Sequence, residues 1–178
     1  MRAEIVYAIL ALMASACGDF TGSNITNQQY ETSPCGGFST TQGFRSDRAY
    51  CDAEVLRFQY DASRGRLELT DSRVLLNCCG LRSFGLSQVG DVFVATETDL
   101  PDFDQTDSVE GRCRCNCAID FRLRAEAIPS GVLPFRLDRA IFEQGETHVI
   151  YQGELDLSAG TGEIVIDDQP IDVDQCPI

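Results

Sequence analysis

Nine cysteines are the residues of this sequence with the most evident chemistry, and their spacing restricts what that chemistry is. Cys113, Cys115 and Cys117 alternate with polar residues, and the adjacent pair Cys78 and Cys79 lies earlier in the chain. Thiolates in such numbers can hold Zn²⁺ or Cu⁺, or they can pair as disulfides in an oxidising compartment. The spacing lacks the C-x₂-C pattern that wraps one ion. We therefore predict disulfides, with Cys113, Cys115 and Cys117 as the alternative thiolate metal site.

Eight of the cysteines, all except Cys17, form an even set that predicts a framework of four bridges, and eight cysteines allow 105 pairings. They are Cys35, Cys51, Cys78, Cys79, Cys113, Cys115, Cys117 and Cys176. Neighbours at i and i+2 on a strand are about 6.7 Å apart and point the same way, so they do not pair readily. A bond between Cys78 and Cys79 would strain their own peptide. We expect Cys35 and Cys51 to close the loop between them, while Cys78, Cys79 and Cys176 pair with the three cysteines of the 113–117 segment.

Few other residues offer catalytic or metal-binding chemistry. His148 is the only histidine, and it lies in phase with the polar residues Gln152 and Glu154, which predicts a surface position rather than a catalytic one. The acidic segment 99–110 offers oxygen ligands for Ca²⁺ from Asp102, Asp104, Asp107 and Glu110. The segment lacks the glycine and the spacing of an EF-hand, so we predict a solvated loop without metal. We predict no enzyme activity and no cofactor.

The segments that must position these residues show an apolar period of two almost throughout, which is typical of β-strands. Leu56, Phe58 and Tyr60 alternate with polar residues, and a turn over 61–65 leads into a second alternating segment over 66–69, which predicts a hairpin. Further strands are expected at 74–76, 92–96, 133–137, 149–157 and 164–166. We predict an all-β fold, a single antiparallel β-sandwich of about seven to nine strands bridged by disulfides.

The segment from Cys113 to Ala127 connects the cysteines to this fold. Its odd positions are three cysteines followed by apolar residues such as Ile119 and Phe121, and nearly every even position is polar. Because successive side chains on a strand point to opposite faces, the three cysteines are expected on the buried face of one long strand. This register predicts cysteines that are structural, oxidised and buried.

The N-terminal residues predict export. A short basic start precedes an uninterrupted stretch of 12 apolar or small residues, Ile5 to Ala16, which suits a signal peptide and is shorter than the roughly 20 residues of a membrane-spanning helix. The stretch ends in Ala14-Ser15-Ala16-Cys17, which resembles the lipobox of bacterial lipoproteins. The resemblance is confined to this N-terminal segment. It implies cleavage before Cys17 and attachment of a diacylglycerol and an N-acyl chain to that residue, and Gly18 matches what the class shows for outer-membrane sorting.

A second resemblance concerns the cysteine-rich segments. Asn77-Cys78-Cys79-Gly80, followed by Cys113-x-Cys-x-Cys and Asp120-Phe121, is similar to a pattern in uncharacterised exported bacterial lipoproteins. This similarity implies a shared bridged β framework and names no activity.

These observations predict a signal peptide over residues 1–16, a lipid-anchored flexible tether over 17–34, and one disulfide-bridged β-sandwich domain over 35–178. The tether is expected because residues 18–34 contain almost no aliphatic side chains and show no period. The formal net charge of −14 argues against nucleic acid and against electrostatic docking on anionic lipid. The lipid on Cys17 is therefore expected to hold the protein at the membrane.

The leading functional hypothesis is a lipoprotein of the bacterial cell envelope, anchored on the periplasmic or surface face of the outer membrane. Its domain is expected to be a non-enzymatic binding or structural module that presents loops or a sheet face to an envelope protein or a glycan. The alternative is a cysteine-rich envelope protein that carries metal or exchanges disulfides.

Overall fold

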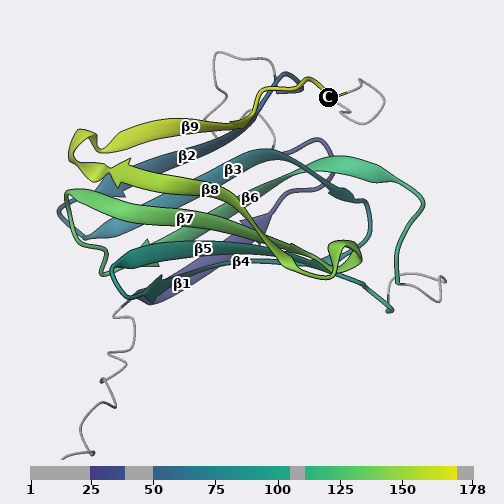
Figure 1. The fold of residues 1–178 in the computed structure, drawn as a ribbon, viewed down its shortest axis with the longest axis horizontal. Coiled ribbons are helices and arrows are strands. Elements are labelled where there is room, and N and C mark those ends of the chain that lie inside the picture. Colours follow the sequence, from purple (N-terminus) through teal and green to yellow (C-terminus); the bar gives the residue numbers. More distant parts are fainter. Residues whose placement is uncertain (1–24, 39–49, 105–110, 172–178) are drawn as a thin grey trace, which may run out of the picture.

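The computed structural model describes residues 25–38, 50–104 and 111–171, which form a β-sandwich (Figure 1). The strands are β1 (Thr26–Thr32), β2 (Glu54–Asp61), β3 (Arg66–Asn77), β4 (Leu81–Val89), β5 (Val92–Leu100), β6 (Asn116–Glu126), β7 (Val132–Ile141), β8 (Thr147–Asp156) and β9 (Thr161–Asp167). Short 3₁₀ turns, η2 (Phe142–Gln144) and η3 (Leu157–Ala159), follow β7 and β8. The predicted all-β sandwich is confirmed. No helix in the described ranges is long and apolar enough to cross a membrane.

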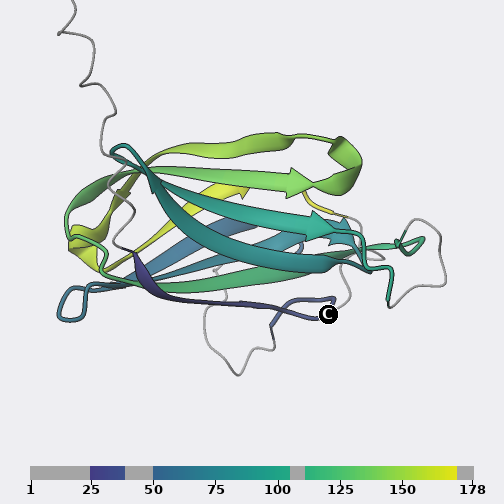
Figure 2. The same cartoon turned by 90° about the horizontal axis from the view of Figure 1, so that it is seen from below.

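Two sheets stack face to face (Figure 2). One has the strand order β1-β6-β3-β2-β9, and the other has the order β4-β5-β7-β8. All neighbouring strands run antiparallel except β5 and β7, which are parallel, so the prediction of a purely antiparallel sandwich is corrected at this pair. The parallel pairing arises because β6, which lies between β5 and β7 in the chain, belongs to the other sheet. The chain crosses to that sheet after β5 and returns, so that β7 runs in the same direction as β5.

The core lies between the two sheets and is filled from alternate positions of the strands, as the period of two predicts. The hairpin predicted around residues 61–65 is confirmed, with Phe58 opposite Leu69 on β2 and β3. Rings from the two sheets meet directly, since Phe84 on β4 and Phe121 on β6 pack edge to face with 5.8 Å between centroids. Both side chains are almost fully buried, so this contact joins the layers through apolar burial and aromatic geometry.

β1 corrects the prediction that residues 17–34 form a flexible tether. From Thr26 onward the chain pairs with β6, with Tyr30 opposite Leu123. The Gln28 side chain also reaches the other sheet, where its amide donates to the Leu86 carbonyl and accepts from the Leu86 N–H, both at 2.8 Å. β1 is an edge strand that is held by such polar contacts and is nearly all exposed, so its sequence needs no apolar period of two. Because this period is missing, the sequence predicts a tether where the structure has a strand.

The sandwich has two distinct ends, here called the turn end and the cysteine end. The turn end carries the connections β2–β3, β4–β5, β6–β7 and β8–β9. The β6–β7 connection hydrogen-bonds to two of the others, through Ile128 N–H to the Gly65 carbonyl and Leu157 N–H to the Gly131 carbonyl. The cysteine end is the opposite one, where β3 ends at Asn77 and β6 begins at Asn116. β1 enters at the turn end and runs toward the cysteine end.

Candidate functional site

Disulfide bridges are concentrated at the cysteine end. In the part of the chain that the structure describes, six cysteines form the bridges Cys35–Cys117, Cys78–Cys115 and Cys79–Cys113, with Cα–Cα distances of 5.4, 5.5 and 5.3 Å. Cys51 is disulfide-bonded as well. The prediction that these cysteines are oxidised and that Cys78 and Cys79 each have a distant partner is therefore confirmed.

Two predicted pairings are wrong. Cys35 bonds to Cys117 rather than to Cys51, because the chain after β1 stays alongside β6. Ser33 N–H donates to the Asp120 carbonyl and Gly36 N–H donates to the Ala118 carbonyl, both at 2.9 Å, which places Cys35 beside the start of β6. Cys176 lies outside the described residues. The three cysteines predicted to include its partner are all bonded elsewhere.

The prediction that one long strand buries all three cysteines is also wrong. β6 begins at Asn116, so Cys117 alone continues the buried face of the strand, with 3% of its surface exposed. Cys113 is half-buried and Cys115 is exposed. Asn77 explains the break, because its amide donates to the Cys113 carbonyl at 2.7 Å and its Oδ1 accepts the N–H groups of Cys113 and Cys79 at 3.1 and 3.0 Å. These bonds hold the segment before β6 in a loop.

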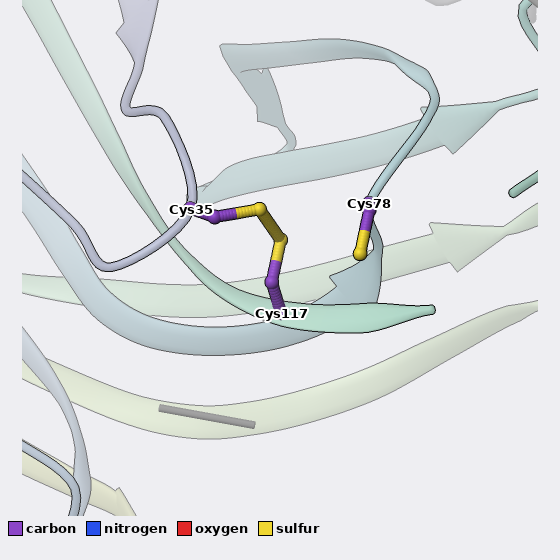
Figure 3. Close-up of side chains that lie close together, drawn as sticks. All are labelled: Cys35, Cys78 and Cys117. Atoms are coloured by element: carbon purple, nitrogen blue, oxygen red, sulfur yellow. A yellow bond between two sulfur atoms is a disulfide. The ribbon is translucent and has the colours of Figure 1, made fainter. Parts of the chain in front are cut away.

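Sulfur atoms of two bridges converge at this end. The Sγ atoms of Cys35, Cys78 and Cys117 all lie within 4.8 Å of one another, and Figure 3 shows Cys78 beside the Cys35–Cys117 bond. The alternative metal site predicted from sequence grouped Cys117 with Cys113 and Cys115, but those three are bonded to three different partners. The converging set thus combines residues from the segment after β1, the end of β3 and the start of β6.

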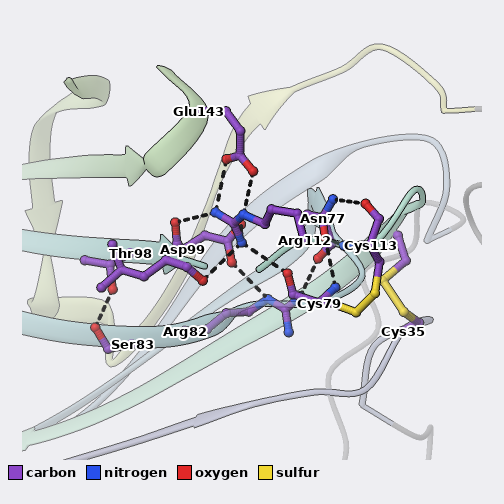
Figure 4. A network of polar contacts seen from close by, with 12 residues as sticks. Cys35, Asn77, Cys79, Arg82, Ser83, Thr98, Asp99, Arg112, Cys113 and Glu143 are labelled. Carbon is purple, nitrogen blue, oxygen red and sulfur yellow. Dashed lines mark hydrogen bonds and ion pairs between the residues drawn. A yellow bond between two sulfur atoms is a disulfide. The ribbon is translucent and has the colours of Figure 1, made fainter. Parts of the chain in front are cut away.

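Arg112 fastens the loop that carries the Cys79–Cys113 bridge (Figure 4). Its guanidinium donates to the carbonyls of Cys79 and Leu100 at 3.1 Å and to that of Asp99 at 2.9 Å. It also forms ion pairs with the Asp99 carboxylate, at 3.1 Å, and with Glu143. Burial raises the pKa of Asp99, and the charges of Arg112 and Arg82 oppose that rise. The arginine therefore neutralises a buried carboxylate while it satisfies three backbone carbonyls.

Asp120 plays a comparable role on the outer face of β6. Its Oδ1 accepts the Tyr50 hydroxyl at 2.7 Å and the Arg73 N–H at 3.0 Å, and its Oδ2 accepts the Phe38 N–H at 2.9 Å. Burial and then the negative charge of Asp120 raise the pKa of Tyr50. Arg73 occupies a β-bulge with a φ of 71°, which turns its N–H toward Asp120. The aspartate thus binds the segments that flank residues 39–49 onto the sheet.

The other residues singled out in the sequence do not gather into one site. Asp102 is buried and its Oδ1 accepts the Asp104 N–H at 3.1 Å, whereas Asp104 is exposed. Asp107 and Glu110 lie outside the described residues. A bulge in the pairing of β7 with β8 changes the phase of β8, so His148 is half-buried and lies opposite Arg139. The predicted surface position of His148, which assumed regular alternation along the strand, is therefore wrong.

A buried ionic cluster that was not predicted from the sequence lies between the sheets. Arg139 on β7 contacts three carboxylates, with its Nη2 at 2.8 Å from Glu54 Oε1 and 3.1 Å from Asp71 Oδ2, and its Nε at 2.8 Å from Glu97 Oε2. The exposed fractions of Glu54, Asp71 and Glu97 are 6%, 0% and 1%. A signal was present in the sequence, because Asp71, Glu97 and Arg139 continue the apolar phases of their strands.

The excess of negative charge in this cluster favours the binding of a proton. Three carboxylates and one guanidinium carry a net charge of −2 when all are ionised, which is costly in a desolvated interior. Burial, with the charges of Glu97 and Glu54, raises the pKa of Asp71 well above its ordinary value, and burial also raises the pKa of Glu97. A proton on Asp71, shared with Glu97, would give a hydrogen-bond partner to Asp71 Oδ1 and Glu97 Oε1, the two buried oxygens of this pair that have none. Because these carboxyls are almost fully buried, we assign them a structural role.

Comparison with known proteins adds no family or relative to these observations. No protein-family model, no curated protein and no solved structure matches the chain significantly.

Proposed function

We propose that this chain is an exported lipoprotein anchored to a membrane of the bacterial cell envelope through Cys17, and that its β-sandwich is a non-enzymatic binding or structural module. The observation that carries the proposal is the combination of the Ala14-Ser15-Ala16-Cys17 segment with a domain whose described cysteines are all disulfide-bonded. Disulfides of this density are typical of exported proteins, because the cytosol keeps thiols reduced. A signal segment and an oxidised domain support the same compartment.

The place where the chain enters the sandwich supports a defined orientation for the anchored module. Only residues 18–25 separate Cys17 from β1, and eight residues extend over at most about 30 Å. Since β1 enters at the turn end, the anchor would hold the turn end near the membrane and leave the cysteine end facing away. The exposed aromatic side chains of Phe103 and Phe142, at 63% and 59%, follow strands β5 and β7, which both run toward the cysteine end.

The anchor is tested by replacing Cys17 with serine. We expect the native protein in the detergent phase of a phase-separation experiment and the Cys17→Ser protein in the aqueous phase, because each acyl chain contributes on the order of 10 kcal/mol of membrane affinity. The mass of the mature N-terminus, measured in parallel, should show the lipid. Ser15→Ala, which keeps a small residue in the segment, is the control and should partition like the native protein. Native protein found in the aqueous phase would contradict the anchor.

The binding role is tested by comparing the two ends of the sandwich. We expect Phe103→Ser/Phe142→Ser to weaken binding of an envelope protein or glycan by about tenfold or more, since buried aromatic anchors dominate most interfaces. Val89→Ser/Val132→Ser removes two residues that are each 54% exposed at the turn end, and it should leave binding unchanged. The measurement is the fraction of lipoprotein found in cross-linked adducts on intact envelopes, with thermal unfolding as the test of fold. Equal effects of the two pairs would argue against the cysteine end as the contact surface.

A second candidate function is thiol–disulfide chemistry in the cell envelope. The specific observation in its favour is the convergence of sulfur atoms from two bridges within 4.8 Å. That observation supports a more detailed inference, which does not depend on the lipid anchor.

A further inference from the structure

We propose that Cys35, Cys78 and Cys117 form a thiol–disulfide exchange site that couples the Cys35–Cys117 and Cys78–Cys115 bridges into one redox unit. Their Sγ atoms lie within 4.8 Å of one another, although each bridge spans a different pair of segments. A thiolate released from one bridge therefore has a disulfide sulfur of the other bridge within reach.

An external reagent can enter this unit at an exposed cysteine of either bridge. Cys115, which is bonded to half-buried Cys78, is exposed, and so is Cys35, which is bonded to buried Cys117. Arg114, itself exposed, is adjacent to Cys115 in the chain. Its positive charge favours the approach of a thiolate to Cys115, in a protein whose formal net charge is −14 with Arg114 included. The substrate class that fits is a dithiol, either a small molecule or a protein with two neighbouring cysteines.

The exchange proceeds in balanced steps. A thiolate of the dithiol attacks Cys115 Sγ, the Cys78–Cys115 bond breaks and Cys78 leaves as a thiolate. The second thiol of the reagent resolves the mixed disulfide, so the dithiol is oxidised to a disulfide and Cys115 and Cys78 together gain two electrons. The Cys78 thiolate then attacks Cys35 Sγ. A Cys35–Cys78 bond forms, the Cys35–Cys117 bond breaks, and Cys117 leaves as a thiolate and takes up a proton, with no further change in electron count.

The third bridge at this end provides an internal reference. Cys79 and Cys113 are bonded to one another, and their loop is fastened by Asn77 and Arg112. Neither belongs to the converging set of sulfur atoms. Exchange through the proposed site should therefore leave the Cys79–Cys113 bridge intact, whereas scrambling in an unfolded chain would involve it as often as the others.

The experiment is limited reduction of the native protein with one equivalent of dithiothreitol, followed by an acid quench, alkylation and disulfide mapping by mass spectrometry. We expect peptides linked through Cys78 to Cys35 or to Cys117, with alkylation of Cys115 and of the cysteine that was displaced. Label confined to Cys78 and Cys115, without new bridges, would overturn the proposal. New bridges that include Cys79, Cys113 or Cys51 would overturn it as well, because they indicate general scrambling.

Two double variants control the result. Cys78→Ser/Cys115→Ser removes the bridge that supplies the attacking thiolate, so one equivalent of dithiothreitol should yield no rearranged peptide. Cys79→Ser/Cys113→Ser keeps the converging sulfurs and should still yield the Cys35–Cys78 or Cys78–Cys117 peptide. Should either variant fail to fold, the mapping of the native protein alone still decides between exchange, simple reduction and scrambling.

Discussion

Replacing Arg139 with methionine is expected to lower the free energy of unfolding by about 3–5 kcal/mol at neutral pH, the usual cost of removing one partner from a buried ionic cluster. Arg139 is the cation that Glu54, Asp71 and Glu97 contact directly. Methionine preserves much of the side-chain volume, so the loss reports charge and hydrogen bonding more than packing. Urea unfolding at 25 °C measures the change.

The pH dependence of this variant separates electrostatics from packing. Without the guanidinium, the carboxyls bind protons more tightly in the folded state than in the unfolded state, so lowering the pH should restore part of the lost stability. Arg124→Met is the control, since Arg124 pairs with Glu68 at 2.7 Å with 47% of its side chain exposed, and such pairs are worth about 0–1 kcal/mol. A loss at Arg139 no larger than at Arg124, or one that is independent of pH, would contradict the importance of the cluster.

Replacing Asp71 with asparagine is expected to stabilise the protein at neutral and alkaline pH. The folded protein holds a proton on Asp71 above the ordinary pKa of 3.8, whereas the unfolded chain releases it. Stability from this site is therefore fully present below pH 3.8 and is lost as the pH rises through the raised pKa, at a limiting slope of about 1.4 kcal/mol per pH unit. Asparagine can accept from Arg139 and donate to Glu97 without taking up a proton, so its curve should lack this slope.

The comparison isolates Asp71 because Glu54, Glu97, Arg139 and the nearby His148 are present in both proteins. Measuring unfolding in urea between pH 4 and pH 9 should show curves that diverge as the pH rises, with the variant the more stable. Asp61→Asn is the matched control, since Asp61 lies in an exposed turn where hydrogen bonds from Ser63 lower its pKa. That change should alter the slope only at acid pH and in the opposite direction. Parallel curves for the native and Asp71→Asn proteins would exclude the buried proton.

The strands could be predicted from the sequence because burial on one face leaves a period of two, as in the hairpin around residues 61–65. β1 could not, since it is held through its backbone and through Gln28. The phase of β8 was misread because a bulge, which shifts the alternation by one residue, leaves no mark in composition. Local pattern thus predicts strands that face a core and misses edges and irregularities.

For the cysteines too, one property could be predicted from the sequence and another could not. Their oxidation could be predicted from their number and from the export signal, but the bond from Cys35 to Cys117 depends on a contact between residues 82 apart in the chain. Pairing of that kind follows from topology, which no local pattern contains. The cluster around Arg139 could be predicted in part. Charged residues at apolar positions of the strands indicate that these side chains are buried, but only the fold brings the four of them together.

The bond between Cys35 and Cys117 also determines how the sandwich would respond to a mechanical pull on its N-terminal side. Tension applied before Thr26 acts along β1, so the hydrogen bonds between β1 and β6 resist it together, in shear. If β1 peels away, the extension stops at Cys35, after nine residues or about 30 Å of chain. The force then passes through a covalent bond to Cys117 on β6, which has β1 on one side and β3 on the other. Such a pull is delivered to β6 inside the sheet rather than to the edge strand alone.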